Sequence, residues 1–256
     1  MQHTETNQTE SRIAIVTGAG SGIGCVASRA FSAQGWMVAA IDRDVPGLQE
    51  TAKHTDRIIP IEADVTSDAE LLVKQVVAEV GVPLRLLNNA GICRTGAAAE
   101  MPDDEIAAVF EVNTFAAMRL CKAVVPLMQE TGRGQIINLA SFAGMLPTPQ
   151  LAAYAASKAA LIAYTDVLRR ELKGTGIEVC CVCPPVVETP MVDSIRASAP
   201  STLGGQRGIH PMKVVEAMEH ALAKGQLFAF PGDAKIAGLL KRFAPSVLER
   251  QLNRLQ

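Results

Sequence analysis

The sequence predicts an α/β protein in which one doubly wound parallel sheet of about seven strands carries helices on both faces. Short apolar runs alternate with longer segments of helical character along the chain. Several of these runs, such as residues 177–183, are apolar almost throughout, as strands buried on both faces must be. A glycine-rich turn over residues 17–24 joins the first run to the first helical segment. Together these three observations indicate strand–helix–strand units that build a parallel sheet.

The expected elements follow one another without a repeat or a domain linker. The segment Ser67–Glu70 has the capping-box pattern Ser-x-x-Glu and is expected to start the helix between the third and fourth strands. The other expected helices cover residues 22–34, 103–130 and 211–223, together with the Ala-rich stretch that follows Pro149. The expected strands are Arg12–Thr17, Met37–Ile41, Arg57–Ala63, Leu84–Asn88, Gln135–Ala140, Ile177–Cys183 and Leu227–Phe230.

The chain length favours a single domain. A chain of 256 residues is long enough to bury one large core. We expect a dinucleotide-binding and catalytic unit over residues 11–232. Residues 1–10 contain no apolar run and are predicted to be disordered. Residues 233–256 are predicted to form an amphipathic helical extension.

Composition and charge argue against several classes of protein. A net charge of −2 gives no electrostatic basis for binding nucleic acid. The N-terminus lacks the basic and apolar regions of a signal peptide, and no stretch of 18 apolar residues is present. The six cysteines include no Cys-x-x-Cys pair, and Cys180, Cys181 and Cys183 lie in a strand-like run that favours core packing. We therefore expect a cytoplasmic protein with reduced thiols and no metal site.

The glycine-rich turn predicts a dinucleotide site. Thr17–Gly24 lies between a strand and a helix, where glycines let backbone N–H groups approach a pyrophosphate at the helix N-terminus. Asp42 ends the next strand, where its carboxylate can accept hydrogen bonds from the adenosine ribose and repel a 2′-phosphate. This combination favours NAD and makes NADP the less favoured cofactor. Arg43, directly after Asp42, is the one feature that leaves NADP open.

A second group of polar residues predicts proton-transfer chemistry. Tyr154 and Lys158 are four residues apart on the Ala-rich helix and therefore share one face. Ser141 follows a buried strand and can face the same space. A tyrosine has a pKa of about 10, which is too high for a base near neutrality. We therefore expect the charge of Lys158 to lower the pKa of Tyr154.

These motifs resemble those of the short-chain dehydrogenase/reductase family. Thr17, Gly18, Gly22 and Gly24 match the pattern T-G-x-x-x-G-x-G, and residues 89–91 match N-A-G. Ser141, Tyr154 and Lys158 match the family's Ser and Y-x-x-x-K, and Asn113 matches the Asn that completes its tetrad. The likeness covers roughly residues 12–230. It implies a Rossmann-like fold and hydride transfer between a nicotinamide cofactor and a secondary alcohol or ketone.

The resemblance also implies individual roles. Tyr154 would be the base, Ser141 would hold the substrate oxygen and Asn113 would support a water chain for the proton. Lys158 would also bind the nicotinamide ribose. The implied cofactor contacts are Gly18, Ser21, Gly22, Ile23, Gly24, Asp42, Arg43, Asp64, Val65, Asn89, Ala90, Gly91, Tyr154, Lys158, Val187 and Thr189.

The substrate is less clearly indicated. The expected wall contains Cys93, Arg94, Phe142, Ala143, residues 145–151 and residues 184–208, which are mostly apolar. Such a wall favours a small lipophilic substrate, namely a steroid, a hydroxyacyl chain or an aromatic carbinol. Pro185 stands where the family usually has Gly, which removes an N–H and conformational freedom from the loop over the nicotinamide. The alternatives are an NADPH-dependent ketoacyl-type reductase and, because the fold also suits it, a non-catalytic dinucleotide-sensing protein.

The C-terminal extension carries an expectation of its own. Apolar residues recur at helical spacing over residues 236–255, and the segment is net positive. We expect it to contact a neighbouring subunit of a homo-oligomer, a dimer or a tetramer, or to contact the chain's own lid, which we expect over residues 198–208. Association with an anionic membrane surface is the second interpretation.

Overall fold

The structure is a computed structural model, and it describes residues 12–203 and 205–232. The predictions made for residues 1–10 and for the extension over residues 233–256 lie outside the described residues.

Within the described residues, seven parallel strands form one sheet in the order β3-β2-β1-β4-β5-β6-β7. The order reverses between β1 and β4, because the chain first builds outward to β3 and then returns to the other side of β1. In sheets of this kind, ligands bind at the carboxyl ends of the strands where the order reverses. The strands are Ile13–Thr17 (β1), Met37–Asp42 (β2), Ile58–Glu62 (β3), Arg85–Asn88 (β4), Gly134–Leu139 (β5), Ile177–Val182 (β6) and Phe228–Ala229 (β7).

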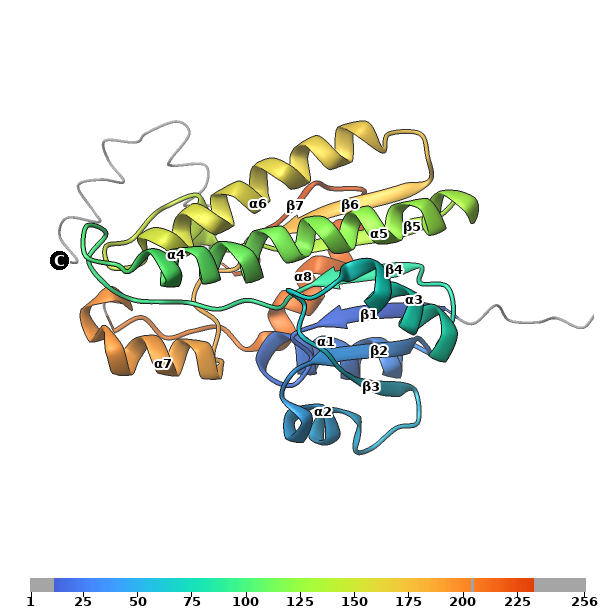
Figure 1. The fold of residues 1–256 in the computed structure, drawn as a ribbon, viewed down its shortest axis with the longest axis horizontal. Coiled ribbons are helices and arrows are strands. Elements are labelled where there is room, and N and C mark those ends of the chain that lie inside the picture. The colour runs from blue at the N-terminus through green and yellow to red at the C-terminus, as the bar shows by residue number, and fades with distance from the viewer. Residues whose placement is uncertain (1–11, 204, 233–256) are drawn as a thin grey trace, which may run out of the picture.

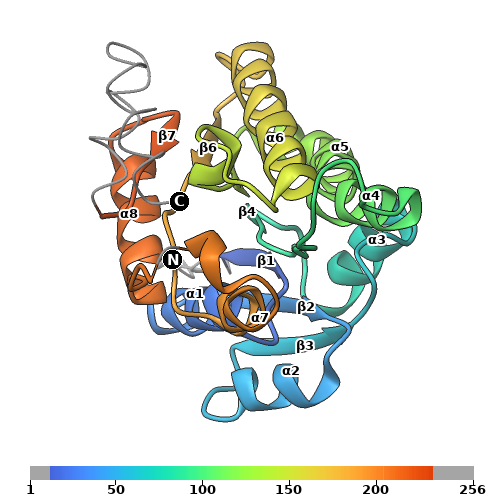
Figure 2. The same ribbon diagram turned by 90° about the vertical axis from the view of Figure 1, so that its left-hand side faces the viewer.

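Helices cover both faces of the sheet (Figures 1 and 2). The α-helices α1, α2 and α8 pack on one face, and α3, α5 and α6 pack on the other. The short helix α7 lies beyond the carboxyl ends of the central strands (Figure 1). The α-helices are Gly22–Ala33 (α1), Val45–Ala52 (α2), Ala69–Glu79 (α3), Asp103–Phe110 (α4), Ala116–Glu130 (α5), Ala152–Glu171 (α6), Pro190–Ser198 (α7) and Pro211–Ala223 (α8).

The alternation of buried side chains along the strands separates two cores. Successive residues of a strand point to opposite faces. Val16 of β1 therefore joins Phe31 of α1 and Met218 of α8 in one core. Ile15, its neighbour in β1, joins Leu120 of α5 and the rest of the other core. Both faces are apolar because both are covered, which confirms the predicted parallel sheet with helices on two sides.

The predicted elements are present, with two local differences. Ser67 does not cap α3, as the capping-box pattern predicted. Asp68 is the N-cap, and its carboxylate accepts from the backbone N–H groups of Glu70 and Leu71 at 2.9 and 3.1 Å. The hydroxyl of Ser67 instead donates to the carbonyl oxygen of Asp64. The predicted helix over residues 103–130 is continuous, but a π-helical turn, Glu111–Phe115, separates α4 from α5.

Candidate active site

The turn between β1 and α1 is shaped by glycines at two points of close approach. Gly18 has a φ of 66°, in the left-handed region that favours glycine. A Cβ on Gly24 would lie 2.0 Å from the carbonyl oxygen of Gly18, so no side chain fits there. Gly24 therefore lets the turn fold back on the first turn of α1. It does not line the pocket described below, and its expected role as a cofactor contact stays a prediction.

A hydrogen-bonded brace joins this turn to the carboxyl end of β4. The Oγ1 of Thr17 accepts from the backbone N–H groups of Asn89 and Ala90, both at 3.0 Å. The side chain of Asn89 in turn donates to the carbonyl oxygens of Thr17 and Gly18 at 2.8 and 3.0 Å. The glycine turn and the N-A-G segment are thus fixed relative to each other across the point where the strand order reverses.

Two carboxylates lie beside this turn. One oxygen of Asp42 accepts from the backbone N–H of Gly20 at 2.8 Å. The carboxylate of Asp64 accepts from both the backbone N–H and the hydroxyl of Thr66, and these bonds hold its pKa below the usual value, with a smaller contribution from the charge of Arg43. Asp42 is therefore positioned by the glycine turn itself.

Ser141 begins a short 3₁₀ turn, Phe142–Gly144, directly after β5. Its Oγ accepts from the backbone N–H of Ala143 at 3.1 Å. A Cβ on Gly144 would lie 2.8 Å from backbone atoms of α6 at Lys158 and Ala159, so glycine allows this turn to pack against the helix that carries Tyr154. The serine and the tyrosine are consequently brought together by backbone packing.

Lys158 is almost completely buried, with 4% of its surface exposed, and its Nζ donates to the carbonyl oxygen of Leu139 at 2.8 Å. Burial lowers the pKa of Lys158 to about 8, and the nearby thiols of Cys181 and Cys183 partly oppose that shift. The Nζ lies 5.9 Å from the centre of the Tyr154 ring. The ammonium is thus held beneath the tyrosine by a backbone oxygen.

The expected lowering of the Tyr154 pKa by Lys158 is wrong. Burial raises the pKa of Tyr154 to about 12, while a hydrogen bond with Ser141 lowers it by less. The physical reason is that removing the phenolate from water outweighs the stabilising groups around it. Tyr154 is therefore protonated near neutral pH.

Asn113 lies in the π-helical turn and is 1% exposed. Its Oδ1 accepts from the backbone N–H of Ile92 at 2.8 Å, and its Nδ2 donates to the Ile92 carbonyl oxygen and to the Oγ of Ser157 at 2.9 and 3.0 Å. Both amide hydrogens are therefore used by protein atoms. Asn113 fixes the chain just after the N-A-G segment and does not line the pocket. Its expected support of a water chain stays a prediction.

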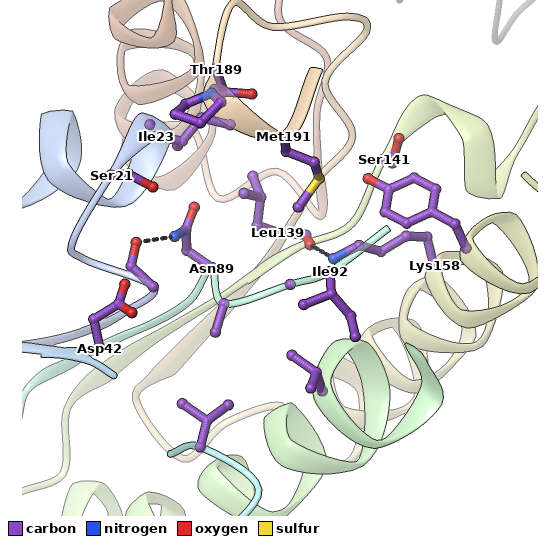
Figure 3. Close-up of a pocket in the computed structure, with 18 of the residues that line it drawn as sticks. Ser21, Ile23, Asp42, Asn89, Ile92, Leu139, Ser141, Lys158, Thr189 and Met191 are labelled. Atoms are coloured by element: carbon purple, nitrogen blue, oxygen red, sulfur yellow. Dashed lines mark hydrogen bonds between the residues drawn. The ribbon is translucent and has the colours of Figure 1, made fainter. Parts of the chain in front are cut away.

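A pocket of about 600 Å³ joins these parts. Figure 3 shows Ser21 and Asp42 at one end, with Ser141 and Lys158 at the other. Every predicted cofactor contact except Gly24 lines it, as do Ser141, Tyr154 and Lys158. The glycine cradle, the carboxylate beside it and the polar residues at the far end fit an extended nicotinamide dinucleotide. The lining residues that sequence reasoning missed are Ala63, Thr66, Ile92, Ala108, Glu111, Val112, Leu139 and Ala140.

The expected substrate wall is only partly correct. Arg94, Pro185, Met191 and Val192 line the pocket. Phe142, Ala143, Met145 and the segment 146–151 do not, because the turn after Ser141 packs on α6, and Met145 packs against Cys181 and Cys183 in a small core. Val186 and Ile195 are also absent from the lining, and Ile195 is buried. Cys180 and Cys181 of β6 and the following Cys183 are all buried, which confirms their predicted core packing.

The segment that carries Met191 and Val192 is attached at its base. The backbone of Glu188 pairs with Ile209, and the carboxylate of Glu188 accepts from the backbone N–H of Gly208. Arg196 of α7 binds the same carboxylate through two nitrogens, at 2.7 and 2.9 Å. Hydrogen bonds from Arg196 and Gly208 lower the pKa of Glu188 to about 2. At the far end of α7, the hydroxyls of Thr95 and Ser198 are 3.0 Å apart, so the segment crosses the opening of the pocket.

The short chain dehydrogenase family matches residues 12–200. The chain belongs to the short-chain dehydrogenase/reductase family. Its relatives include a ketoacyl reductase of Nostoc, HetN, which is 38% identical over 197 residues, 74% of this chain and 69% of the relative. An estradiol 17-beta-dehydrogenase 11 of Rattus norvegicus is 32% identical over 255 residues, 94% of this chain and 84% of the relative. A short-chain dehydrogenase of Streptomyces avermitilis has a similar solved structure, with a TM-score of 0.82, 28% identity and 96% coverage of both chains.

Solved structures of similar short-chain dehydrogenases contain either form of the cofactor. A 3-ketoacyl-(acyl-carrier-protein) reductase of Brucella melitensis, complexed with NADH, has a TM-score of 0.77 and 27% identity over 87% of this chain and 98% of that chain. A variant of actinorhodin polyketide ketoreductase with NADPH has a TM-score of 0.80 and 34% identity over 86% of this chain and 95% of that chain. This short-chain dehydrogenase is thus an NAD(P)-dependent oxidoreductase that acts on alcohol or ketone substrates.

Two further observations apply to residues 12–203 and 205–232 alone. None of the helices there is long and apolar enough to span a membrane. No group of three or more His, Cys, Asp or Glu side chains there is arranged to hold a metal ion.

Proposed function

We propose that this short-chain dehydrogenase is an NAD-preferring enzyme that interconverts lipophilic secondary alcohols and ketones. The observation that carries the proposal is that Asp42 and Ser141 lie at opposite ends of one pocket, and that Tyr154 lines the same pocket and is hydrogen-bonded to Ser141. The first end favours a cofactor with a free ribose 2′-hydroxyl, and the second provides a hydroxyl pair for an alcohol oxygen.

The chain's own residues supply the proton chemistry. When bound, the nicotinamide ring accepts or donates the hydride. Ser141 donates a hydrogen bond to the substrate oxygen, and Tyr154 removes the proton of an alcohol or returns it to a ketone. With a pKa of about 8, Lys158 is mostly charged at neutral pH, and its ammonium stabilises the phenolate that forms on Tyr154. The Leu139 carbonyl holds that ammonium in place.

The carboxylate of Asp42 supports the preference for NAD. A 2′-phosphate placed beside this carboxylate would add like charge within a partly buried site, which costs several kcal/mol. Gly20 fixes the carboxylate through its N–H, so Asp42 cannot easily turn away from the phosphate. Among the described lining residues at the substrate end, Ile92, Met191 and Val192 are apolar, which supports a lipophilic substrate.

The second candidate is an NADPH-dependent ketoacyl-type reductase. It is favoured by the similarity to the ketoacyl reductase HetN and to the NADPH-bound polyketide ketoreductase. Arg43 lines the pocket next to Asp42 and offers a cation to a 2′-phosphate.

A substrate screen separates these candidates. Lipophilic alcohols with NAD and NADP, and ketones and ketoacyl thioesters with NADH and NADPH, are followed by the absorbance of the reduced cofactor. We expect turnover of lipophilic alcohols or ketones with a higher kcat/KM for the NAD couple. Turnover of ketoacyl thioesters with NADPH alone would establish the second candidate. Cofactor binding without turnover of any substrate, by contrast, would indicate a dinucleotide-sensing protein.

Oligomer formation and a cytoplasmic location remain part of the proposal. We infer a homo-oligomer because the sequence predicts an apolar, net positive C-terminal extension, residues 233–256, that suits a subunit contact. Light scattering of the full chain and of a chain lacking that extension tests the inference. An unchanged mass would remove the extension from the interface.

A further inference from the structure

One cationic side chain at the substrate end of the pocket has no assigned partner. Arg94 lines the pocket and is exposed at its opening. In the described part of the chain, no carboxylate lies within salt-bridge distance of its guanidinium. Among residues 12–203 and 205–232, the side chain of Arg94 makes one hydrogen bond, to the carbonyl oxygen of Cys93 at 3.3 Å. A guanidinium has five N–H donors, so most of the binding capacity of Arg94 is available.

The backbone around Arg94 is fixed on both sides. Asn113 holds the backbone of Ile92 at both its N–H and its carbonyl oxygen. Thr95 bonds to Ser198 of α7, and the backbone N–H of Gly96 donates to the carbonyl oxygen of Gln150 at 3.0 Å. Arg94 therefore extends from a held loop at the junction of three segments that surround the opening. A side chain on a fixed base loses less conformational entropy when it binds a ligand.

Arg94 is also close to the reacting groups. Burial raises the pKa of the adjacent Cys93 thiol to about 11, but Arg94 and Lys158 both act to lower that pKa. The thiol therefore lies within the electrostatic reach of both cations. Arg94 and Tyr154 line the same pocket of about 600 Å³, so one bound molecule can contact both side chains.

The carboxylates that line the pocket do not pair with Arg94. Asp42 and Asp64 line the adenosine end of the pocket, away from Ser141 (Figure 3 shows Asp42). Glu111 also lines the pocket, and its carboxylate is paired with Arg119. Met191, which lines the pocket between its two ends in Figure 3, is apolar.

We propose that Arg94 is a specificity residue that binds an anionic group of the substrate at the pocket opening. The substrate is then amphipathic, with an apolar region around the alcohol or ketone carbon and a carboxylate, sulfonate or phosphate at its far end. This inference rests on the proposed function and deepens it, because it adds a charge requirement to the lipophilic substrate. A guanidinium binds such planar or tetrahedral anions through two N–H groups at once.

The test uses a homologous series of methyl ketones that end in a carboxylate, together with the methyl esters of the same acids. Wild-type enzyme, Arg94→Gln and Arg94→Glu are compared with NADH. Arg57→Gln is the matched control, because Arg57 is also exposed but does not line the pocket. We expect the wild type to prefer the acid over the ester at one chain length. A charge-assisted pair of hydrogen bonds corresponds to about 1.5–3 kcal/mol, or roughly ten- to a hundredfold in kcat/KM.

The loss of substrate affinity in Arg94→Gln should be confined to the charged substrates. Arg94→Gln is expected to raise KM for the acid about tenfold or more and to leave the ester within about twofold, while Arg94→Glu reverses the preference. Arg57→Gln should behave as wild type. An acid-to-ester ratio that is the same in wild type and Arg94→Gln overturns the proposal, even if both compounds are reduced.

A binding measurement keeps the proposal testable if no ketone of the series is reduced. Calorimetry with the enzyme–NAD complex compares saturated alkanoates with their methyl esters. Tighter binding of the alkanoate to wild type, lost in Arg94→Gln, supports the inference even though the proposed substrate class has failed. Equal binding of alkanoate and ester to wild type overturns it.

Discussion

Lys158 and Leu139 are joined by a hydrogen bond of 2.8 Å between a buried ammonium and a backbone carbonyl oxygen. Leu139 is the last residue of β5, and Ser141 follows two residues later. The same strand end therefore positions the cation that stabilises a phenolate and the hydroxyl that holds the substrate. A shift of β5 relative to α6 would disturb both groups together.

Replacement of Tyr154 by Phe removes the proposed base and little else. We expect the fold and cofactor binding to persist, while turnover falls by about three decades, because positioned proton transfer contributes about 10²–10⁴ in rate. Single-turnover measurement of the reduced cofactor gives the rate, and circular dichroism provides the control for folding. Retention of more than about a tenth of wild-type turnover would contradict the assignment.

The titration of the two tyrosines tests the electrostatics of the cofactor-free site. Burial raises the pKa of Tyr154 to about 12 and also raises the pKa of Tyr164 above its ordinary value. We expect no phenolate absorbance in the native protein until well above pH 10. Because the unfolded tyrosines lose their protons first, their contribution to stability is present below pH 10 and is lost as pH rises toward 12.

The control for that titration is the Tyr154→Phe variant, in which the signal should correspond to Tyr164 alone. A phenolate that appears near pH 8 in the wild type but not in Tyr154→Phe would show that the charge of Lys158 outweighs burial.

Asp42→Asn tests the cofactor preference with little change of shape. The amide oxygen can still accept from Gly20, whereas Asp42→Ala would remove that acceptor altogether. Wild type should prefer NAD over NADP by more than about a hundredfold in kcat/KM, and the variant should narrow this ratio because the negative charge is gone. Steady-state kinetics with both cofactors gives the ratio. Equal use of NAD and NADP by the wild type is the result that would refute the assignment of Asp42.

Thr165→Val tests how α6 is fixed to β5. The Oγ1 of Thr165 accepts from the Nδ2 of Asn138 at 2.9 Å, and both residues are fully buried. Valine leaves that Nδ2 without its partner, which costs about 1–3 kcal/mol of unfolding free energy. Thr165→Ser keeps the hydroxyl and should recover most of the loss that comes from the hydrogen bond. Denaturant unfolding measures both variants, and a stability equal to wild type in Thr165→Val would argue against the role of this bond.

Short-range patterns made the fold and much of the site predictable. The spacing of Tyr154 and Lys158 on one helix requires only helical geometry, and the position of Asp42 requires only the end of a strand. What could not be predicted depends on packing between distant segments. The acceptor of Lys158 is a backbone oxygen, which no residue type reveals. Asn113 is directed toward Ile92 by a π-helical turn that has no sequence signal in an otherwise regular helical run.

The substrate wall was predicted less well for a related physical reason. Neighbours of Ser141 in the sequence were assumed to share its environment. In a 3₁₀ turn, however, successive side chains point in directions about 120° apart. Gly144 lets that turn pack on α6, and Met145 is thereby directed into a core. Arg94, by contrast, lies in the loop after β4, and Met191 lies at the start of α7. Both segments follow strand ends, where the topology makes convergence predictable.

The π-helical turn at Glu111–Phe115 interrupts a regular helix and at the same time positions Asn113 against Ile92. Such a turn carries one residue more than an α-helix needs, so the side chains before and after it are out of phase by about 100°. Deletion of a single residue there would restore a regular helix from α4 into α5 and would at the same time turn Asn113 away from Ile92. Selection for a more stable helix and selection for a working site therefore act in opposite directions on this stretch. Glu111 and Val112 of this turn also line the pocket, so a deletion there would disturb the cofactor site as well as the contact of Asn113 with Ile92.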